Sequence, residues 1–321
     1  MATLNVFLTV DVEMWPPYWE ASDAEYLQAF RRYIHGVGSP EAFGLPYQLR
    51  LLADHGLKGV FFVEPLFASM VGRSALEEVV GMIVEAGQEI QLHLHPEWLG
   101  RAGDPQLPGP YQLAMRRLRR EDQAWLIDLG RRWLEEAGAP PIRAFRAGSF
   151  GANRDTLRAL ADCGINVDFS QNSAGPRGAL DPALPEDVSM TDPGVLEIPL
   201  TTYRDGLGRH RPLQLGSSGY AETRAVLERC CAAGRRTAAI LSHSAELLDG
   251  SRQRRDSTVV RRFQKLCRLL DRERDVLATT WTTEVHNAWA HEVIGPPKAI
   301  RAPVAGSALR YMEQALRRLR A

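Results

Sequence analysis

Short apolar runs alternate with longer amphipathic segments along most of this chain, and this alternation limits the folds that the chain can adopt. The runs are rich in β-branched and aromatic residues, which is typical of buried strands. Strands are predicted at 4–10, 59–63, 89–95, 143–146, 165–169, 195–200, 237–241 and 276–280. Segments with helical spacing separate them, at 41–54, 74–86, 120–137, 153–163, 220–233 and 259–273. Strands that alternate with helices predict a parallel α/β sheet with helices outside it, open or closed.

The chain has 321 residues and no break in composition that would mark a domain boundary. Because α/β barrels of this length commonly form one domain, we expect a single domain over residues 1–295. The remaining segment, 296–321, begins with a proline-containing linker. From 305 to 320 it has the pattern of an amphipathic basic helix, which is expected to pack on the barrel or on a partner.

Charge, cysteine usage and the N-terminal segment exclude several classes of protein. The 39 basic and 39 acidic side chains give a formal net charge of zero, whereas a nucleic-acid-binding protein usually has a large basic excess. The four cysteines show no CxxC spacing, which favours free thiols in a reducing compartment. The first residues lack a basic segment, an acid stands at position 11, and no stretch approaches 18 apolar residues. We therefore expect a cytoplasmic protein with no signal peptide and no membrane span.

Ionisable side chains stand at the carboxyl ends of four predicted strands, where functional groups gather in parallel α/β folds. They are Asp11, Glu13, His93, His95, Arg146 and His243. Residues i and i+2 of a strand point to the same side, so His93 and His95 can converge on one point, as can Asp11 and Glu13. Two imidazoles and a carboxylate form an open metal site with room for water and substrate. The alternative is a pair of half-buried histidines bonded to backbone, and the acidic strand end favours the metal site.

Five short motifs, in this order along the chain, resemble those of the polysaccharide deacetylases of the NodB-homology, carbohydrate esterase 4 type. They lie at 9–13, 87–93, 145–149 (followed by 153–160), 197–200 and 241–244. The resemblance implies a distorted (β/α)7-type barrel as a single catalytic domain. It also implies a metal-dependent hydrolase that removes an N-acetyl group from an amino sugar of a polysaccharide or its precursor.

The resemblance also implies roles for the residues at the strand ends. Asp11 is expected to be the catalytic base, Glu13 a metal ligand and His243 the general acid, while Arg146 is expected to pair with Asp11 and fix its direction. Cleaving an acetamide requires an activated nucleophile, a polarised carbonyl and a proton for the leaving amine, and a divalent metal supplies the first two. Imidazole and carboxylate ligands suit zinc, with cobalt, nickel and manganese as alternatives.

The sequence departs from the family at the expected metal site. The family usually has Asp where Glu13 stands, and its two histidines are four residues apart. Strict spacing from His93 therefore points to Glu97 as the second ligand, whereas strand geometry points to His95. We expect His95, because Pro96 should end the strand and turn Glu97 away from its face. The longer Glu13 side chain is expected to reach a metal that is shifted by the shorter spacing.

Aromatic residues gather near the expected mouth of the site, and aromatic faces suit the C–H surfaces of sugar rings. Trp15 and Trp98 are expected to line the cleft, and Ser149 is a third candidate for binding substrate. Two segments rich in proline and glycine, 100–111 and 173–194, are expected to cap the cleft and set substrate choice. The five other histidines are expected to be structural.

Two other functions stay open from the sequence. One is hydrolysis of a small non-sugar amide or cyclic imide. The other is a catalytically inactive barrel that binds a glycan or a partner, a function that the altered histidine spacing keeps open.

Overall fold

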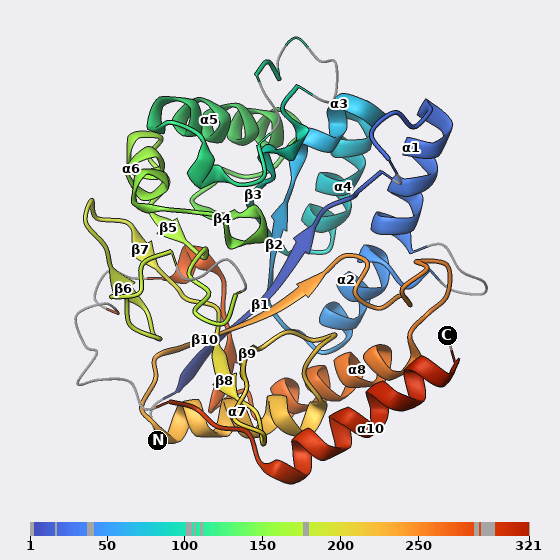
Figure 1. Cartoon of the computed structure of the whole chain (residues 1–321), viewed down its shortest axis with the longest axis vertical. Coiled ribbons are helices and arrows are strands. Elements are labelled where there is room, and N and C mark those ends of the chain that lie inside the picture. Colours follow the sequence, from blue (N-terminus) through green and yellow to red (C-terminus); the bar gives the residue numbers. More distant parts are fainter. Residues whose placement is uncertain are drawn as a thin grey trace.

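A computed structural model describes residues 3–16, 18–36, 42–100, 105, 107–109, 112–175, 180–285, 289 and 299–320. Its centre is a sheet with the strand order β10-β1-β2-β3-β4-β5-β7-β6, surrounded by helices (Figure 1). These strands are Thr237–His243, Leu4–Val12, Gly59–Val63, Glu89–Leu94, Ala144–Ala147, Val167–Asp168, Leu196–Glu197 and Ser189–Met190. All neighbouring pairs are parallel except β6 and β7.

The sheet curls until its two ends meet. Leu200, just beyond β7, pairs in parallel with Ala239 of β10, and the Thr201 N–H donates to the Ala239 carbonyl at 3.2 Å. Seven parallel strands therefore form a ring that is closed by an isolated bridge and not by a full ladder. This is the distorted (β/α)7-type barrel that the sequence predicted, and the predicted fold class is confirmed.

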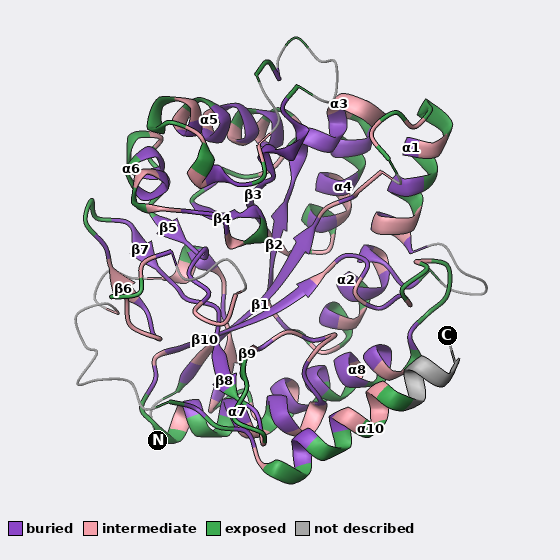
Figure 2. Cartoon of the chain, in the orientation of Figure 1, coloured by how far each residue is buried: buried purple, intermediate pink, exposed green. Residues whose placement is uncertain are grey.

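Alternate residues of β1 face different layers of the molecule. The outward residues pack in a large apolar cluster between sheet and helices: Leu4, Val6, Leu8, Val10 and Val12. Phe7 instead belongs to a second cluster inside the barrel, where its ring lies 5.2 Å from that of Phe169. Because Thr9 and Asp11 share the parity of Phe7, they lie on the inner side as well, toward the carboxyl end of the strand. The seven parallel strands are buried almost throughout (Figure 2).

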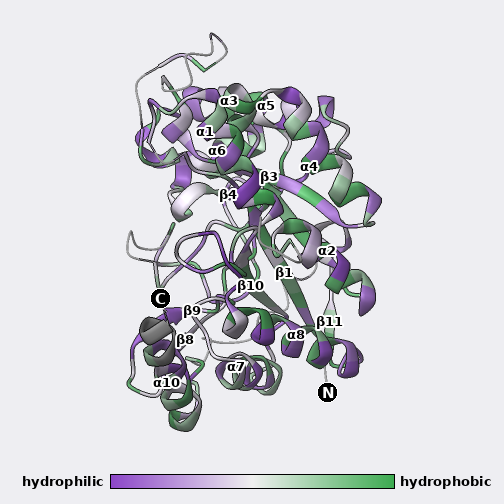
Figure 3. Cartoon of the chain, turned by 90° about the vertical axis from the view of Figure 1, so that its right-hand side faces the viewer, coloured by the Kyte–Doolittle hydropathy of each residue, from purple (hydrophilic) through white to green (hydrophobic). Residues whose placement is uncertain are grey.

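Ten helical segments of four residues or more are described around the barrel. They are α1 (Asp23–Phe30), a π-helical turn (Arg31–His35), α2 (Leu45–Asp54), α3 (Ala68–Val71), α4 (Arg73–Glu85), α5 (Arg120–Glu136), α6 (Arg154–Asp162), α7 (Tyr220–Ala232), α8 (Ser257–Arg272) and α10 (Val304–Arg320). Helices α7, α8 and α10 lie together at one end of the molecule, opposite α3, α5 and α6, in both Figure 1 and Figure 3. Every helix that the sequence predicted is present, with ends that differ by at most a few residues.

Some elements were not predicted from the sequence. Helix α1 was missed because it buries only Tyr26, Ala29 and Phe30, which gives its sequence little helical period. The hairpin of β8 (Thr202–Arg204) and β9 (His210–Pro212) was missed because both strands are three residues long and partly exposed. The predicted strand at 276–280 is present as β11 (Leu277–Thr279), which pairs with the start of β1.

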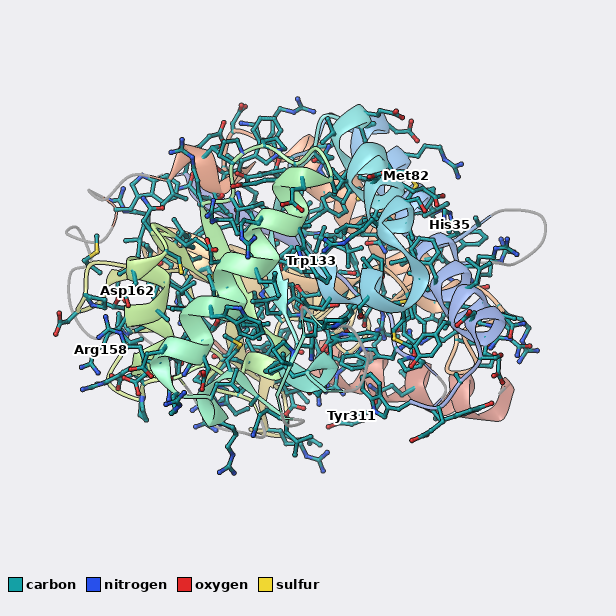
Figure 4. All side chains as sticks on the ribbon, turned by 90° about the horizontal axis from the view of Figure 1, so that it is seen from above. His35, Met82, Trp133, Arg158, Asp162 and Tyr311 are labelled. Carbon is teal, nitrogen blue, oxygen red and sulfur yellow. The ribbon has the colours of Figure 1, made fainter. Side chains whose placement is uncertain are left out.

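Several polar side chains away from the strand ends form local surface contacts. Of the five histidines expected to be structural, the structure describes His35, His55 and His210, and the other two lie outside the described residues. His35, at the rim of the molecule in Figure 4, lies 3.1 Å from Glu78. Asp162, also at the rim in that view, pairs with an arginine of α5 at 2.7 Å. These contacts are those of a solvated surface.

Helix α10 is the helix predicted for the C-terminal segment, and it packs on the barrel domain through buried charges. Arg310 has no exposed side-chain surface; its Nε lies 2.8 Å from Glu222 of α7 and its Nη2 lies 2.9 Å from Asp205. Glu222 also accepts a hydrogen bond from Ser307 at 2.6 Å. The predicted division of the chain at residue 295 stays a prediction. Among the residues that the structure describes, no helix has the length and hydropathy needed to span a membrane.

We predict that Arg310→Met destabilises the protein strongly, because it leaves two buried carboxylates without their guanidinium. Removal of one partner from a buried ion pair costs about 3–5 kcal/mol, measured here as the free energy of unfolding in urea. Arg224→Met is the matched control: Arg224 and Glu228 form an exposed pair at 2.7 Å, whose loss should cost less than about 1 kcal/mol. Similar small decreases in the free energy of unfolding in both variants would contradict the idea that buried charges attach α10 to the barrel.

Candidate metal centre and catalytic site

The six ionisable residues that the sequence singled out lie close together at the carboxyl ends of β1, β3, β4 and β10. They are Asp11, Glu13, His93, His95, Arg146 and His243. The parallel register brings them there, since Asp11 stands opposite His243 and His93 stands opposite Arg146. Residues separated by more than two hundred positions therefore share one site. The roles expected for them stay predictions.

Arg146 is the most deeply buried member of this group, with no exposed surface. Its Nη1 lies 2.5 Å from Asp11 Oδ1, and its Nη2 donates to the Thr9 hydroxyl at 2.9 Å. The guanidinium also lies over the ring of Phe62, 4.3 Å from its centroid. A charge-assisted hydrogen bond and an aromatic face together fix the guanidinium, and the guanidinium in turn fixes the Asp11 carboxylate.

Three potential metal ligands converge beside this pair. The Nε2 atoms of His93 and His95 lie 3.3 Å and 2.9 Å from the same oxygen of Glu13, and ligand atoms of all three lie within 4.8 Å of one another. His93 Nε2 is 3.8 Å from Asp11 Oδ2. Burial opposes the ionisation of Glu13, but the neighbouring histidines hold its pKa well below the usual range. Burial also opposes a charge on His95, yet Glu13 and Glu97 raise its pKa to about 10.

The other ring nitrogen of each histidine has a partner behind the cluster. His93 Nδ1 donates to the Arg146 carbonyl at 2.8 Å, and His95 Nδ1 lies 3.2 Å from Glu97 Oε2. Metal-binding histidines commonly donate their second N–H to a carbonyl or a carboxylate, so both rings present Nε2 in the manner of a ligand. The donor set and its orientation therefore fit a divalent cation. This geometry favours His95 over Glu97 as the ligand that accompanies His93. Glu97 contacts the His95 ring at Nδ1, on the side away from the cluster.

Gly148 leaves the space that the His95 ring occupies. This role of Gly148 was not predicted from the sequence. A Cβ atom on Gly148 would lie 2.5 Å from the ring, so any side chain here would push His95 away. On another side, the ring of Trp15 meets that of His95 edge-on, with centroids 4.7 Å apart. The signal in the sequence is a glycine directly after the strand that carries Arg146.

His243 has its own carboxylate partner, which sequence reasoning also missed. Its Nδ1 lies 2.6 Å from Glu246, and both Glu246 oxygens accept hydrogen bonds from Gln214 at 3.2 Å. Burial lowers the pKa of His243, but the hydrogen bond and charge of Glu246 outweigh this effect and raise the pKa to about 9. A Cβ atom on Gly216 would lie 1.8 Å from Glu246, so Gly216 gives the carboxylate its room. An acid three residues after a strand-end histidine was the available signal.

A second carboxylate pair lies deeper in the barrel, next to Arg146. Burial raises the pKa of Glu197 well above its usual range, and the charge of Asp168 adds to this effect. The positive charge of Arg146 acts in the opposite direction. Burial also raises the pKa of Asp168, so the barrel interior disfavours a charge on either member of this pair.

The three residues expected to bind substrate differ in their surroundings. Trp15 lines a pocket together with Glu13 and His243. Trp98 has no exposed surface, because its ring stacks behind Trp15, with centroids 6.0 Å apart. The expectation that Trp98 lines the cleft is therefore wrong, and it supports Trp15 instead. Ser149 is exposed and has a left-handed backbone, with φ of 52°, but it is not part of the pocket wall.

The two segments expected to cap the cleft are only partly described. Most of 100–111 lies outside the described residues. Segment 173–194 contributes β6 (Ser189–Met190), which pairs with the edge of the sheet at β7. The pocket itself has a volume of about 470 Å³ and continues from Glu13 and His243 along the loop that follows β10.

Comparison with known proteins finds similar solved structures. A Mycobacterium smegmatis protein, provisionally described as a polysaccharide deacetylase, matches with a TM-score of 0.59 at 15% identity, over 93% of this chain and 94% of that one. The 4-α-glucanotransferase of Thermococcus litoralis matches with a TM-score of 0.54 at 12% identity, over 95% of this chain and 42% of that one. A family 4 carbohydrate esterase of Streptomyces lividans matches with a TM-score of 0.43 at 12% identity, over 87% and 92%. No protein-family model and no curated protein matches the sequence.

The fold is therefore that of the NodB-type polysaccharide deacetylases, as the motifs implied. A glucanotransferase shares it, so the fold by itself does not determine the reaction. The reaction depends on the side chains of the site.

We predict that Gly148→Ala weakens binding of a divalent metal without removing any candidate ligand, since the new methyl group displaces the His95 ring. Calorimetric titration with zinc should show at least about a tenfold loss of affinity, as expected when the support of a ligand is disturbed. The control is Gly81→Ala in α4, where a Cβ atom has nothing within 4 Å and affinity should be unchanged. Wild-type affinity in Gly148→Ala would contradict this account of the His95 position.

We further predict that substitution of His95 reduces zinc binding more than substitution of Glu97, the other candidate for the ligand that accompanies His93. His95→Ala should abolish zinc binding, whereas Glu97→Gln should weaken it by about 10–100-fold, because Glu97 acts through the His95 ring. The metal content of each variant after dialysis against a weak chelator measures these losses of zinc binding. Full loss in Glu97→Gln with retention in His95→Ala would reverse the assignment.

Proposed function

We propose that this protein is a metal-dependent hydrolase that removes the N-acetyl group from an amino sugar of a polysaccharide or its precursor. The observation that carries the proposal is the convergence of Glu13, His93 and His95 on one point, with His93 Nε2 3.8 Å from the Asp11 carboxylate. His243 lines the same pocket as Glu13. A base, an acid and a ligand set for one cation are thus present in one site of a deacetylase-type fold.

Glu13, His93 and His95 would hold the cation. Zinc suits two imidazoles and a carboxylate, with cobalt, nickel or manganese as alternatives. When bound, such an ion lowers the pKa of water and polarises a carbonyl.

The side chains around this ligand set supply the proton transfers. The Asp11 carboxylate, held in one orientation by Arg146, which itself donates to Thr9, accepts the proton of the water that attacks the acetyl carbonyl. His243 gives a proton from Nε2 to the departing amine, since its Nδ1 is engaged by Glu246. Trp15, backed by Trp98, offers an aromatic surface in the pocket wall to a sugar ring.

The alternatives have less support. A pocket of about 470 Å³ with an indole in its wall exceeds the needs of a small amide or cyclic imide. A barrel that only binds a glycan or a partner would not require a buried Arg146–Asp11 pair aimed at a ligand cluster. A cytoplasmic location, with a glycan precursor as substrate, is part of this proposal.

The test is metal analysis of the purified protein together with acetate release from a panel of N-acetylated sugars. We predict bound metal and acetate release, with turnover reduced by about 10²–10⁴-fold in Asp11→Asn and in His243→Asn. Asp54→Asn, at an exposed acid at the end of α2, is the control and should retain full turnover. Absence of both metal and acetate would refute the proposal.

The pH profile tests the role of His243 separately. A proton donor works below its pKa, so the carboxylate of Glu246, which raises the pKa of His243, extends activity to higher pH. We predict that Glu246→Gln moves the alkaline limb of the profile of acetate release to lower pH, toward the usual histidine value of about 6.5. Asp249→Asn, which lines the same pocket, should leave this limb in place. An unmoved limb in Glu246→Gln would contradict His243 as the acid.

A further inference from the structure

We propose that the substrate carries an anionic group, a phosphate or a carboxylate, beside its acetylated amino sugar, and that Arg252 binds this group. This inference rests on the proposed function for the sugar part of the substrate. It concerns the far wall of the pocket, which extends from Glu13 and His243 along the loop after β10 to Tyr33 and Arg252.

The backbone at Arg252 holds the side chain in the pocket wall at a cost. Its φ is 57°, in the left-handed region, which non-glycine residues adopt at an energetic penalty and mainly where function requires it. Among the described residues the only other non-glycine positions of this kind are Ser149 and Phe150, directly after the strand that carries Arg146. All three therefore follow barrel strands that supply the site.

The direct contacts of the Arg252 guanidinium are with neutral groups. Its Nη1 donates to the Ala245 carbonyl at 2.8 Å, and its central carbon lies 5.3 Å from the centroid of the Tyr33 ring. No carboxylate of the described residues forms an ion pair with it within 4 Å. A carbonyl and an aromatic face fix the group in place, and the remaining N–H donors are left for a ligand.

The acids in the same wall already have cationic partners. Glu246 lies 2.6 Å from His243, and Asp249 lies 3.1 Å from an arginine that is not part of the wall. Glu13 belongs to the ligand cluster and lies 2.9 Å from His95. Among the described residues, Arg252 is therefore the charged group of the wall that forms no direct ion pair, although its charge helps to lower the pKa of Glu246.

The size of the pocket and the chemistry of the guanidinium define the class of ligand. A volume of about 470 Å³ lies in the range of about 300–1,000 Å³ that takes whole ligands, so an acetamide alone would not fill it. A guanidinium matches the planar, bidentate geometry of phosphate and carboxylate oxygens. An amino sugar that carries either group would place its acetamide near Glu13 and its anion at Arg252.

The experiment measures dissociation constants of three compounds: N-acetylglucosamine, its 1-phosphate, and N-acetylmuramic acid, which carries a carboxylate. Calorimetry is performed on Asp11→Asn, so that turnover does not interfere. We expect the phosphate, the carboxylate or both to bind at least about tenfold more tightly than the neutral sugar, and the two arms identify the preferred group. Equal affinity for all three compounds would overturn the proposal.

Variants of Arg252 in the same background test its part in this preference. Arg252→Gln should abolish the preference, and Arg252→Lys, which keeps the charge, should retain part of it. Arg255→Gln is the matched control, because Arg255 lies over the Phe43 ring outside the pocket wall and the preference should persist. An unchanged preference in Arg252→Gln would overturn the proposal.

Acetate release from the same compounds by the wild-type protein separates the two proposals. If no compound releases acetate but anion binding depends on Arg252, the deacetylase proposal fails and the assignment of Arg252 as the anion-binding residue stands. If all three release acetate and bind equally well, the deacetylase proposal stands and this inference fails.

Discussion

The buried guanidinium of Arg146 is the group on which the geometry of the site depends. Its side chain orients the Asp11 carboxylate, and its backbone carbonyl accepts the Nδ1 hydrogen of His93. One residue thus positions both the expected base and one expected ligand. A buried charge is expensive unless it is paired, so Arg146 and Asp11 require each other for stability as well as for orientation. Phe62 and Phe169 below them exclude water and keep this pair in an environment of low polarity.

The barrel provides that environment through strand parity and parallel register. Inward positions near the start of the strands, such as Phe7 and Val60, form an apolar layer, and inward positions near their carboxyl ends carry the ionisable groups. The same two-residue step that buries Phe7 places Thr9, Asp11 and Glu13 successively closer to the mouth. Because neighbouring strands are in register, the ends of β1, β3, β4 and β10 present these groups at one level.

The features that depend on local sequence pattern could be predicted from the sequence. Alternating strands and helices predicted a parallel α/β sheet, the resemblance of five motifs implied that it closes into a barrel, and the spacing of His93 and His95 predicted that their rings converge. Contacts that depend on loop conformation could not be predicted from the sequence. They include Glu246 beside His243, Gly148 against His95, and Arg252 in the pocket wall. Trp98 shows the same limit, because its burial behind Trp15 results from how two loops fold over each other and has no signature in the local sequence.

The central claim is that Glu13, His93 and His95 bind one divalent cation beside the Arg146–Asp11 pair. The most direct measurement is a crystal structure of the zinc-soaked protein with anomalous data collected on both sides of the zinc absorption edge. The account predicts one strong anomalous peak bound by a Glu13 carboxylate oxygen and by Nε2 of both histidines, with the contact between Arg146 and Asp11 intact. The absence of a peak at this point, or a zinc ion bound through Glu97 instead of His95, would contradict it.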